Sequence, residues 1–244
     1  MRQYIRLGLP AAVFVSIFLT VATALQHPDK PLRAGQREVD ERQYPIVDLS
    51  AQEPLDEEKI KKRRAKGKRY NKSTTVVNPV LVNVVENHHW PRDFPALPIA
   101  QSAIIVLGQA KEAKAYLSSD ETGVYSEFVV QVDEVFKNST PEPLRPGDTF
   151  AAEREGGRVR YKSGHVSQYA ITGLGMPRVG SMYLLFLSKT ESNCQIITGY
   201  ELRAGFVAPL DSSGVVNFDR YRGWSETTFL DEVRAAVGIR SGAH

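Results

Sequence analysis

The segment Val124–Lys137, VYSEFVVQVDEVFK, constrains the fold of this chain more than any other part of its sequence. On an extended backbone, one side of it is mostly apolar and carries Val124, Ser126, Phe128, Val130, Val132 and Phe136. The other side is largely polar and carries Tyr125, Glu127, Gln131 and Asp133. This period of two, in a segment rich in β-branched and aromatic residues, predicts a long, half-buried β-strand.

Shorter strand signals surround this segment. Ala103–Ala110 predicts a buried strand with a bulge or bend at Gly108, and Lys111–Thr122 predicts a polar connection. The nearly continuous apolar run Ser181–Leu187 predicts a strand that is covered on both faces. Many short strands joined by glycine- and proline-rich loops predict a mainly β fold, a small closed or nearly closed β-barrel over residues 96–240.

A helix is predicted at the end of this domain. Thr228 is its expected N-cap, with Asp231 three residues later as in a capping box. Phe229 and Val233 then fall on one apolar face, and Gly238 stands at the stop position.

The order of these signals resembles a family. The same order of strands and turns occurs in exported bacterial proteins, which this chain resembles. The signals that carry the resemblance are an apolar strand with Gly108, the Val124–Lys137 strand, the turn Pro146-Gly147-Asp148, the pair Gly156-Gly157 and the strand after Val179-Gly180. Those proteins resemble the oligonucleotide/oligosaccharide-binding (OB) barrel of tissue inhibitors of metalloproteinases and netrin modules. The resemblance covers residues 99–210 and implies an OB-like barrel that binds a ligand. The animal inhibitors use an N-terminal cysteine and disulfides, so their mechanism does not transfer to a chain with one cysteine.

The N-terminal 24 residues have the pattern of a secretory signal peptide. Arg2 and Arg6 precede the apolar stretch Leu7–Leu25, and Ala22-Thr23-Ala24 supplies small residues for cleavage. The alternative is an uncleaved anchor in the inner membrane. Either way the domain is expected outside the cytoplasm, periplasmic or extracellular, and a single cysteine favours a bacterial envelope.

Residues 25–73 are expected to form a disordered, charged linker, and residues 74–95 an extended arm, with its place in the barrel left open. Nine of the fourteen residues in 59–72 are Lys or Arg and none is acidic. This basic run fits a solvated tether, or a contact with anionic lipid or cell-wall polymer. Nucleic acid is not an expected partner, because the positive charge lies outside the predicted folded part.

No sequence motif for a metalloprotease, a nucleophile elbow or a phosphate-binding loop is present, and no cofactor, metal or enzymatic activity is predicted. Glu153 and Glu155 could form a carboxylate pair, but surface ion pairing with the interleaved Arg154, Arg158 and Arg160 is the plainer interpretation.

The predicted ligand surface is the loop 156–175. Its candidate ligand-binding residues are Tyr161, His165, Tyr169 and Arg158, since aromatic side chains at regular spacing suit a sugar or peptide. The sequence thus predicts a non-catalytic, exported binding module for an envelope protein or polysaccharide. The alternatives are an envelope hydrolase with a dispersed site that uses His165, Glu153 and Glu155, and a structural tether.

Overall fold

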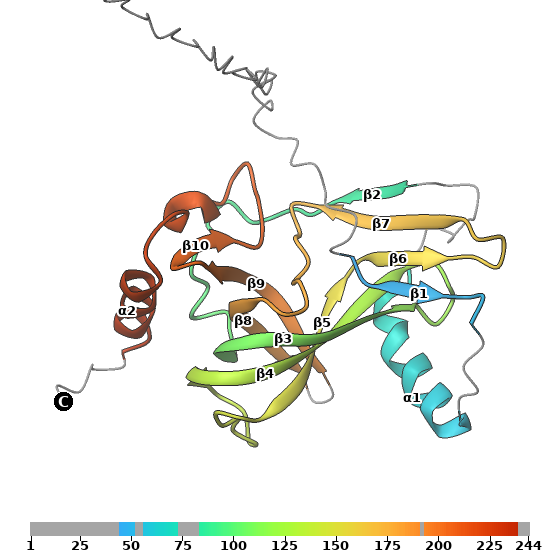
Figure 1. The fold of residues 1–244 in the computed structure, drawn as a ribbon, viewed down its shortest axis with the longest axis horizontal. Helices are drawn as coiled ribbons and strands as arrows, with labels where there is room; N and C mark the ends of the chain where they lie inside the picture. Colours follow the sequence, from blue (N-terminus) through green and yellow to red (C-terminus); the bar gives the residue numbers. More distant parts are fainter. Residues whose placement is uncertain (1–43, 52–55, 73–82, 191–192, 239–244) are drawn as a thin grey trace, which may run out of the picture. The chain divides into compact units, whose positions relative to one another are not determined.

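The computed structural model describes residues 44–51, 56–72, 83–190 and 193–238, so the predicted signal peptide lies outside the described residues. The described chain is mainly β and has a helix at its C-terminal end, as predicted (Figure 1). In chain order its elements are β1 (Ile46–Asp48), α1 (Glu57–Gly67), the 3-10 helix η2 (Lys68–Tyr70), β2 (Asn83–Asn87), β3 (Ile104–Leu117), β4 (Val124–Asn138), β5 (Thr149–Glu155), β6 (Gly157–Arg160), β7 (Val166–Thr172), β8 (Met182–Thr190), β9 (Asn193–Arg203), β10 (Phe206–Pro209), the 3-10 helix η3 (Phe218–Tyr221) and α2 (Glu226–Val237).

Five strands of the larger sheet pair in a closed circuit, in the order β3-β4-β5-β9-β8. Four of the pairings are antiparallel, including those of β3 with β4 and with β8. The fifth is a parallel pairing between β5 and β9 at Glu153 and Gln195. All five strands contribute side chains to one buried apolar cluster, which includes Phe128 and Leu185. β10 extends the sheet beside β9.

The central strand is confirmed as β4, but two of its side chains are placed differently. Tyr125, predicted on the largely polar side, is fully buried, and Phe136 does not face the main apolar cluster. Phe128, Val130 and Val132 lie in the main apolar cluster, as the period of two predicts. The pairing with β3 shifts register near the end of β4, and Phe136 packs instead in a second cluster, with Phe229 of α2. Bulges of this kind break the alternation, so the predicted face of Phe136 is wrong.

β3 is longer than predicted. Its first half is the expected buried strand, and a register shift occurs beside Gly108, where an added Cβ would lie 2.5 Å from the backbone oxygen of Gln131. The strand then continues to Leu117 through residues predicted to form a polar connection. Those residues pair with the first half of β4, so cross-strand hydrogen bonds override their polar composition.

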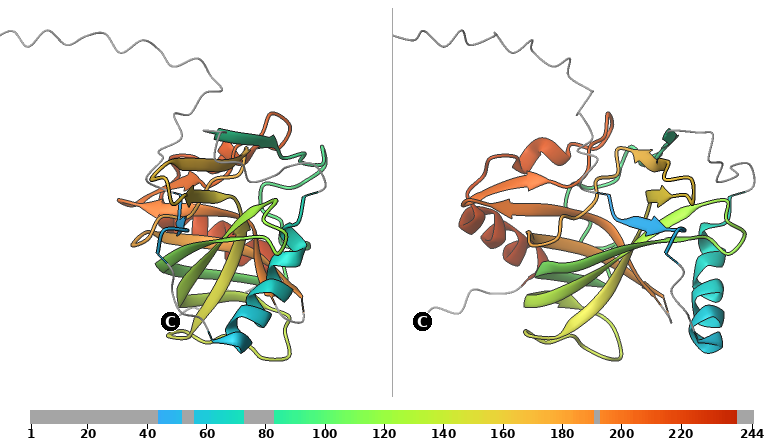
Figure 2. Two further views of the ribbon diagram at one scale, coloured as in Figure 1. Left: turned by 90° about the vertical axis from the view of Figure 1, so that its right-hand side faces the viewer. Right: turned by 45° about the vertical axis from the view of Figure 1, so that its right-hand side comes forward.

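A smaller sheet, in the order β1-β6-β7-β2, lies beside the larger one (Figure 2). Only Gly156, at φ 105°, separates β5 from β6, so the chain passes sharply from one sheet to the other. β6 and β7 form a hairpin, and β1 and β2 pair parallel with its two strands. Part of the predicted arm is therefore an edge strand, β2, while residues 74–82 lie outside the described residues.

α2 begins three residues earlier than predicted. The Ser225 hydroxyl accepts a hydrogen bond from the Thr228 N–H at 3.2 Å, so Ser225 is the N-cap and the prediction of Thr228 is wrong. Gly238 ends the helix in a left-handed conformation, as expected. Phe229 and Val233 are fully buried and fix α2 to the sheet.

Candidate functional site

The basic run folds onto the domain. Residues 56–72, which the sequence assigns to a disordered linker, form α1 and η2, and Figures 1 and 2 show α1 lying beside β4 and β5. The Asp56 carboxylate caps α1 by accepting a hydrogen bond from the Glu58 N–H at 2.7 Å. Short helices with little apolar surface are marginal alone, so contacts with the sheet are needed to hold this one.

The buried carboxylate of Glu153 is the centre of these contacts. Glu153 lies on β5 and is only 1% exposed. Its carboxylate accepts hydrogen bonds at 2.7 Å from Lys66 Nζ and from Arg69 Nη2, and at 2.9 Å from the Tyr70 hydroxyl. Lys66 also reaches Glu127 of β4 at 2.7 Å, so one lysine bridges two neighbouring strands. Three donors satisfy a buried charge that would otherwise be costly.

Aromatic contacts complete this interface. The rings of Tyr70 and Tyr125 stack with centroids 4.4 Å apart and planes within 9°. The Arg63 guanidinium lies 4.7 Å from the ring centroid of Tyr116, which stands opposite Tyr125 on β3. Such cation–π and stacking contacts add to the ion pairs and extend the interface along α1.

The turn between β3 and β4 contacts the C-terminal end of the basic segment, at residues 70–72. The Asn71 carboxamide oxygen accepts hydrogen bonds from the backbone N–H and the hydroxyl of Ser119. At Gly123 an added Cβ would lie 2.2 Å from the backbone oxygen of Tyr70. The backbones therefore approach more closely there than any side chain would permit.

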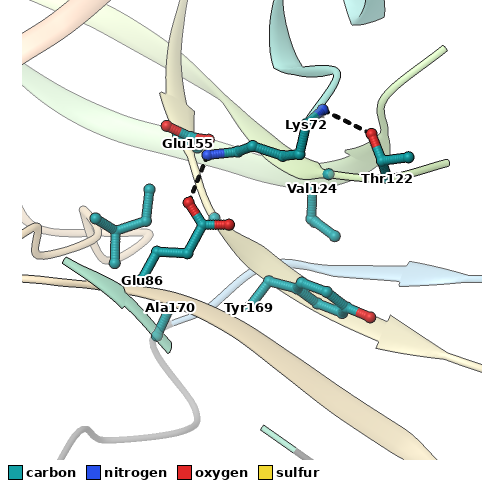
Figure 3. Close-up of a pocket in the computed structure, with 10 residues that line it drawn as sticks. Lys72, Glu86, Thr122, Val124, Glu155, Tyr169 and Ala170 are labelled. Atoms are coloured by element: carbon teal, nitrogen blue, oxygen red, sulfur yellow. Dashed lines mark hydrogen bonds and ion pairs between the residues drawn. The ribbon is translucent and has the colours of Figure 1, made fainter. Parts of the chain in front are cut away.

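Lys72 joins the two sheets. Figure 3 shows its ammonium between the carboxylates of Glu86, on β2, and Glu155, on β5. Its backbone N–H donates to the Thr122 hydroxyl at 2.7 Å. The pocket around these groups has a volume of about 20 Å³, enough for one water molecule.

The charges of this interface reinforce each other. Burial lowers the pKa of Lys66, but its hydrogen bonds to Glu127 and Glu153 outweigh burial, and the net pKa lies above the ordinary lysine value. The pKa of Lys72 is raised for the same reasons, through Glu155 and Glu86. Both lysines are therefore fully charged at neutral pH.

Apart from Arg63, the remaining cations of the run are exposed. Lys59, Lys61, Lys62, Arg64 and Lys68 are exposed to solvent. The basic run is thus divided between an inner set that fixes the segment and an outer set that is free to meet a ligand.

The predicted ligand-binding residues are placed differently. Tyr161 and Tyr169 are buried in a third apolar cluster, and their hydroxyl oxygens lie 3.2 Å apart. They do not form an exposed face, because the loop that was expected to carry them is the β6–β7 hairpin. His165 lies at its turn, half-buried, and Arg158 lies on β6, where its backbone N–H donates to the Pro45 oxygen at 2.8 Å.

The predicted ion pairing among Glu153, Glu155 and the interleaved arginines is wrong. Both carboxylates bind cations of the basic segment instead. Arg154 points to the opposite side of β5, where it is buried and pairs with Asp211. Both hydrolase candidates on β5 are therefore engaged in ion pairs, and neither has a described contact with His165.

Other chemistry is sparse in the part of the chain that the structure describes. No group of three His, Cys, Asp or Glu residues there could hold a metal ion. Cys194 is a buried free cysteine, and burial raises the pKa of its thiol to about 12. None of the helices within these residues is both long and apolar enough to cross a membrane.

The interface beneath α1 was missed at the sequence level, although one signal pointed to it. The period of two already placed Glu127 on the polar side of β4, and the same rule places Glu153 and Glu155 together on one side of β5. A face with three carboxylates needs cations, and the basic run is the largest source of them in the sequence.

Comparisons of the chain with protein-family models and with curated proteins find no match.

Proposed function

We propose that this protein is an exported, non-catalytic binding module of the bacterial envelope, built on a small OB-like barrel. The closed circuit β3-β4-β5-β9-β8, with its single parallel pair, supports such a five-stranded barrel. Export is supported by the basic N-terminus, the apolar stretch Leu7–Leu25 and the small residues Ala22-Thr23-Ala24 near the end of that stretch.

The contact surface follows from the strand order. OB barrels bind ligands on the outer face of their second and third strands, which correspond here to β4 and β5. In this chain α1 and η2 cover part of that face, through Glu127, Glu153 and Glu155. A ligand that approaches from this side therefore meets the solvent side of α1.

One observation carries this proposal: the basic run is divided into cations bound to the sheet and cations presented to solvent. Lys66, Arg69 and Lys72 bind buried or half-buried carboxylates. Lys61 and Arg64, from the same helix, are exposed. A tether with no binding role would not need a helix fixed to the domain. A surface that recognises an anionic partner gains from such fixing, because less conformational entropy is lost on binding.

Photo-cross-linking in living cells tests the proposal. A photoreactive residue replaces Ala65, on the exposed side of α1, and in a control protein it replaces Ser163, at the exposed turn between β6 and β7. We expect a discrete adduct from position 65 and none from position 163. The adduct should disappear when Lys61 and Arg64 are changed to glutamine. Adducts that are equal at both positions, or that persist in the glutamine variant, would refute the proposed contact surface.

A further inference from the structure

Three exposed cations form a stripe along one side of α1 and the first residue of η2. Lys61, Arg64 and Lys68 are spaced i, i+3 and i+7, so they lie on one face of the helical segment. All three are exposed, and none has an ion-pair partner within the residues that the structure describes. Lys62 is exposed beside the stripe and pairs with Glu58 at 2.8 Å. Lys59, seven residues before Lys66, falls on the other side of the helix.

The underside of α1 holds this stripe at a fixed angle to the domain. Lys66 and Arg69 are bound to Glu153, and Tyr70 is stacked on Tyr125. The acidic groups beneath the helix are thereby neutralised by its inner cations. Their negative charge therefore does not offset the outer stripe.

We propose that this stripe docks the domain on a bilayer that contains anionic phospholipids. The inference rests on the proposed function and names the ligand of the same surface. Clusters of four to eight lysines and arginines on a helix are typical of binding sites for anionic headgroups. The apolar stretch Leu7–Leu25 in the same chain gives a second reason to choose a bilayer over a soluble polymer, because it brings the domain to a membrane during export.

The strength expected of the contact is modest. Each cation near an anionic surface strengthens binding about fivefold, so neutralising three of them weakens docking about a hundredfold. Exposed charges are screened within about 10 Å at 0.1 M salt, so the contact weakens as salt is raised. A patch of this size sets the orientation of a domain that a second signal already holds near the membrane.

The test uses the full chain in vesicles, with a nitroxide at position 65 (Ala65→Cys) or, as a control, at position 163 (Ser163→Cys). Cys194 is buried and leaves the introduced thiol as the reactive one. The vesicles contain phosphatidylcholine alone, or phosphatidylcholine mixed with phosphatidylglycerol. The readout is protection of the nitroxide from a water-soluble relaxation agent. We expect protection at position 65 in the anionic vesicles alone, and none at position 163.

Two triple variants with the same net charge provide the matched comparison. The stripe variant changes Lys61, Arg64 and Lys68 to glutamine. The control variant changes three exposed cations elsewhere in the domain to glutamine: Lys111, Lys162 and Arg203. The stripe variant should abolish protection of the nitroxide at position 65, and the control variant should keep it.

Equal protection in neutral vesicles, or equal loss in both variants, would overturn the lipid assignment. A cross-link in cells from position 65 without docking on anionic vesicles would also overturn it, and would leave the binding module in place with a polymer or protein as its partner. Absence of both signals would overturn the proposed function as well.

Discussion

Replacing Glu153 with glutamine removes the charge that holds the basic segment on the sheet, while it preserves the shape of the side chain. Wild-type Glu153 accepts hydrogen bonds from Lys66, Arg69 and Tyr70. Lys66 and Arg69 contact different oxygens of the carboxylate, so the glutamine amide keeps an acceptor for one of these cations and presents its N–H groups to the other. The change therefore tests whether the carboxylate, and not merely the packing, fixes α1.

The expected cost is about 2 kcal/mol of unfolding free energy. Hydrogen bonds to charged groups contribute about 1.5–3 kcal/mol, and removal of one partner from a fully buried pair costs about 3–5 kcal/mol. This case falls at the lower end, because the side chains of Lys66 and Arg69 are 25% and 32% exposed and regain contact with water. Lys66 also keeps its bond to Glu127. For a domain of this size the melting temperature should fall by about 4–8 °C.

Urea denaturation and limited trypsin digestion together measure the effect. Trypsin cuts after the lysines and arginines of residues 57–72, so local release of α1 appears as faster cleavage there. Glu112→Gln is the matched control, because Glu112 is exposed on β3 and its change should alter stability by less than about 0.5 kcal/mol. If Glu153→Gln matches this control in both stability and cleavage rate, the carboxylate does not hold the segment and the reasoning fails.

Three further outcomes are expected. The hydrogen bonds of Lys66 to Glu127 and Glu153 outweigh burial and raise its pKa above 10.5, so the stability that it contributes is lost as pH rises through the higher folded pKa. The difference in unfolding free energy between wild type and Lys66→Met should therefore stay constant from neutral pH to about pH 10.5 and narrow above it. A difference that already closes between about pH 7 and pH 10 would count against the ion pairs. Gly123→Ala should cost about 1–3 kcal/mol in urea denaturation because its Cβ meets the Tyr70 carbonyl, whereas Gly214→Ala, with open space around it, should be near neutral; equal effects would contradict the close approach. Cys194 should resist a thiol reagent at pH 8 in the native protein and react fully in guanidinium, and rapid native reaction would show that the thiol is not buried.

The core strand β4 was predictable because the alternation of apolar and polar residues is contained within its own segment of the sequence. Alternation over Val124–Val132 requires one buried face, and the structure has that face. Phe136 was misplaced because a bulge arises from pairing with β3, which local alternation does not encode. The strand after Ala110 was missed for a related reason, since its polar residues become a strand only through a partner.

The site was less predictable, although part of it was within reach. Successive side chains on a strand point to opposite faces, so Arg154 could never have paired with Glu153 on β5. Applying that rule would have shown an acidic face without a local counter-charge. The basic run docks on this face through contacts that are distant in sequence. Lys66 contacts Glu127, 61 positions later in the chain, and Glu153, 87 positions later. Composition alone predicts a linker there.

Residues 57–72 are a fixed part of the domain, held on the sheet by its carboxylates. Amide hydrogen exchange of the full chain, resolved to the peptides that cover α1, measures how firmly this segment is held. We expect slow exchange for the amides of residues 61–67 in the wild type, and a loss of protection in Glu153→Gln that is larger for these amides than for those of β4. If α1 in the wild type exchanges at the rate of an unstructured peptide, the basic run is a linker and is not fixed to the sheet.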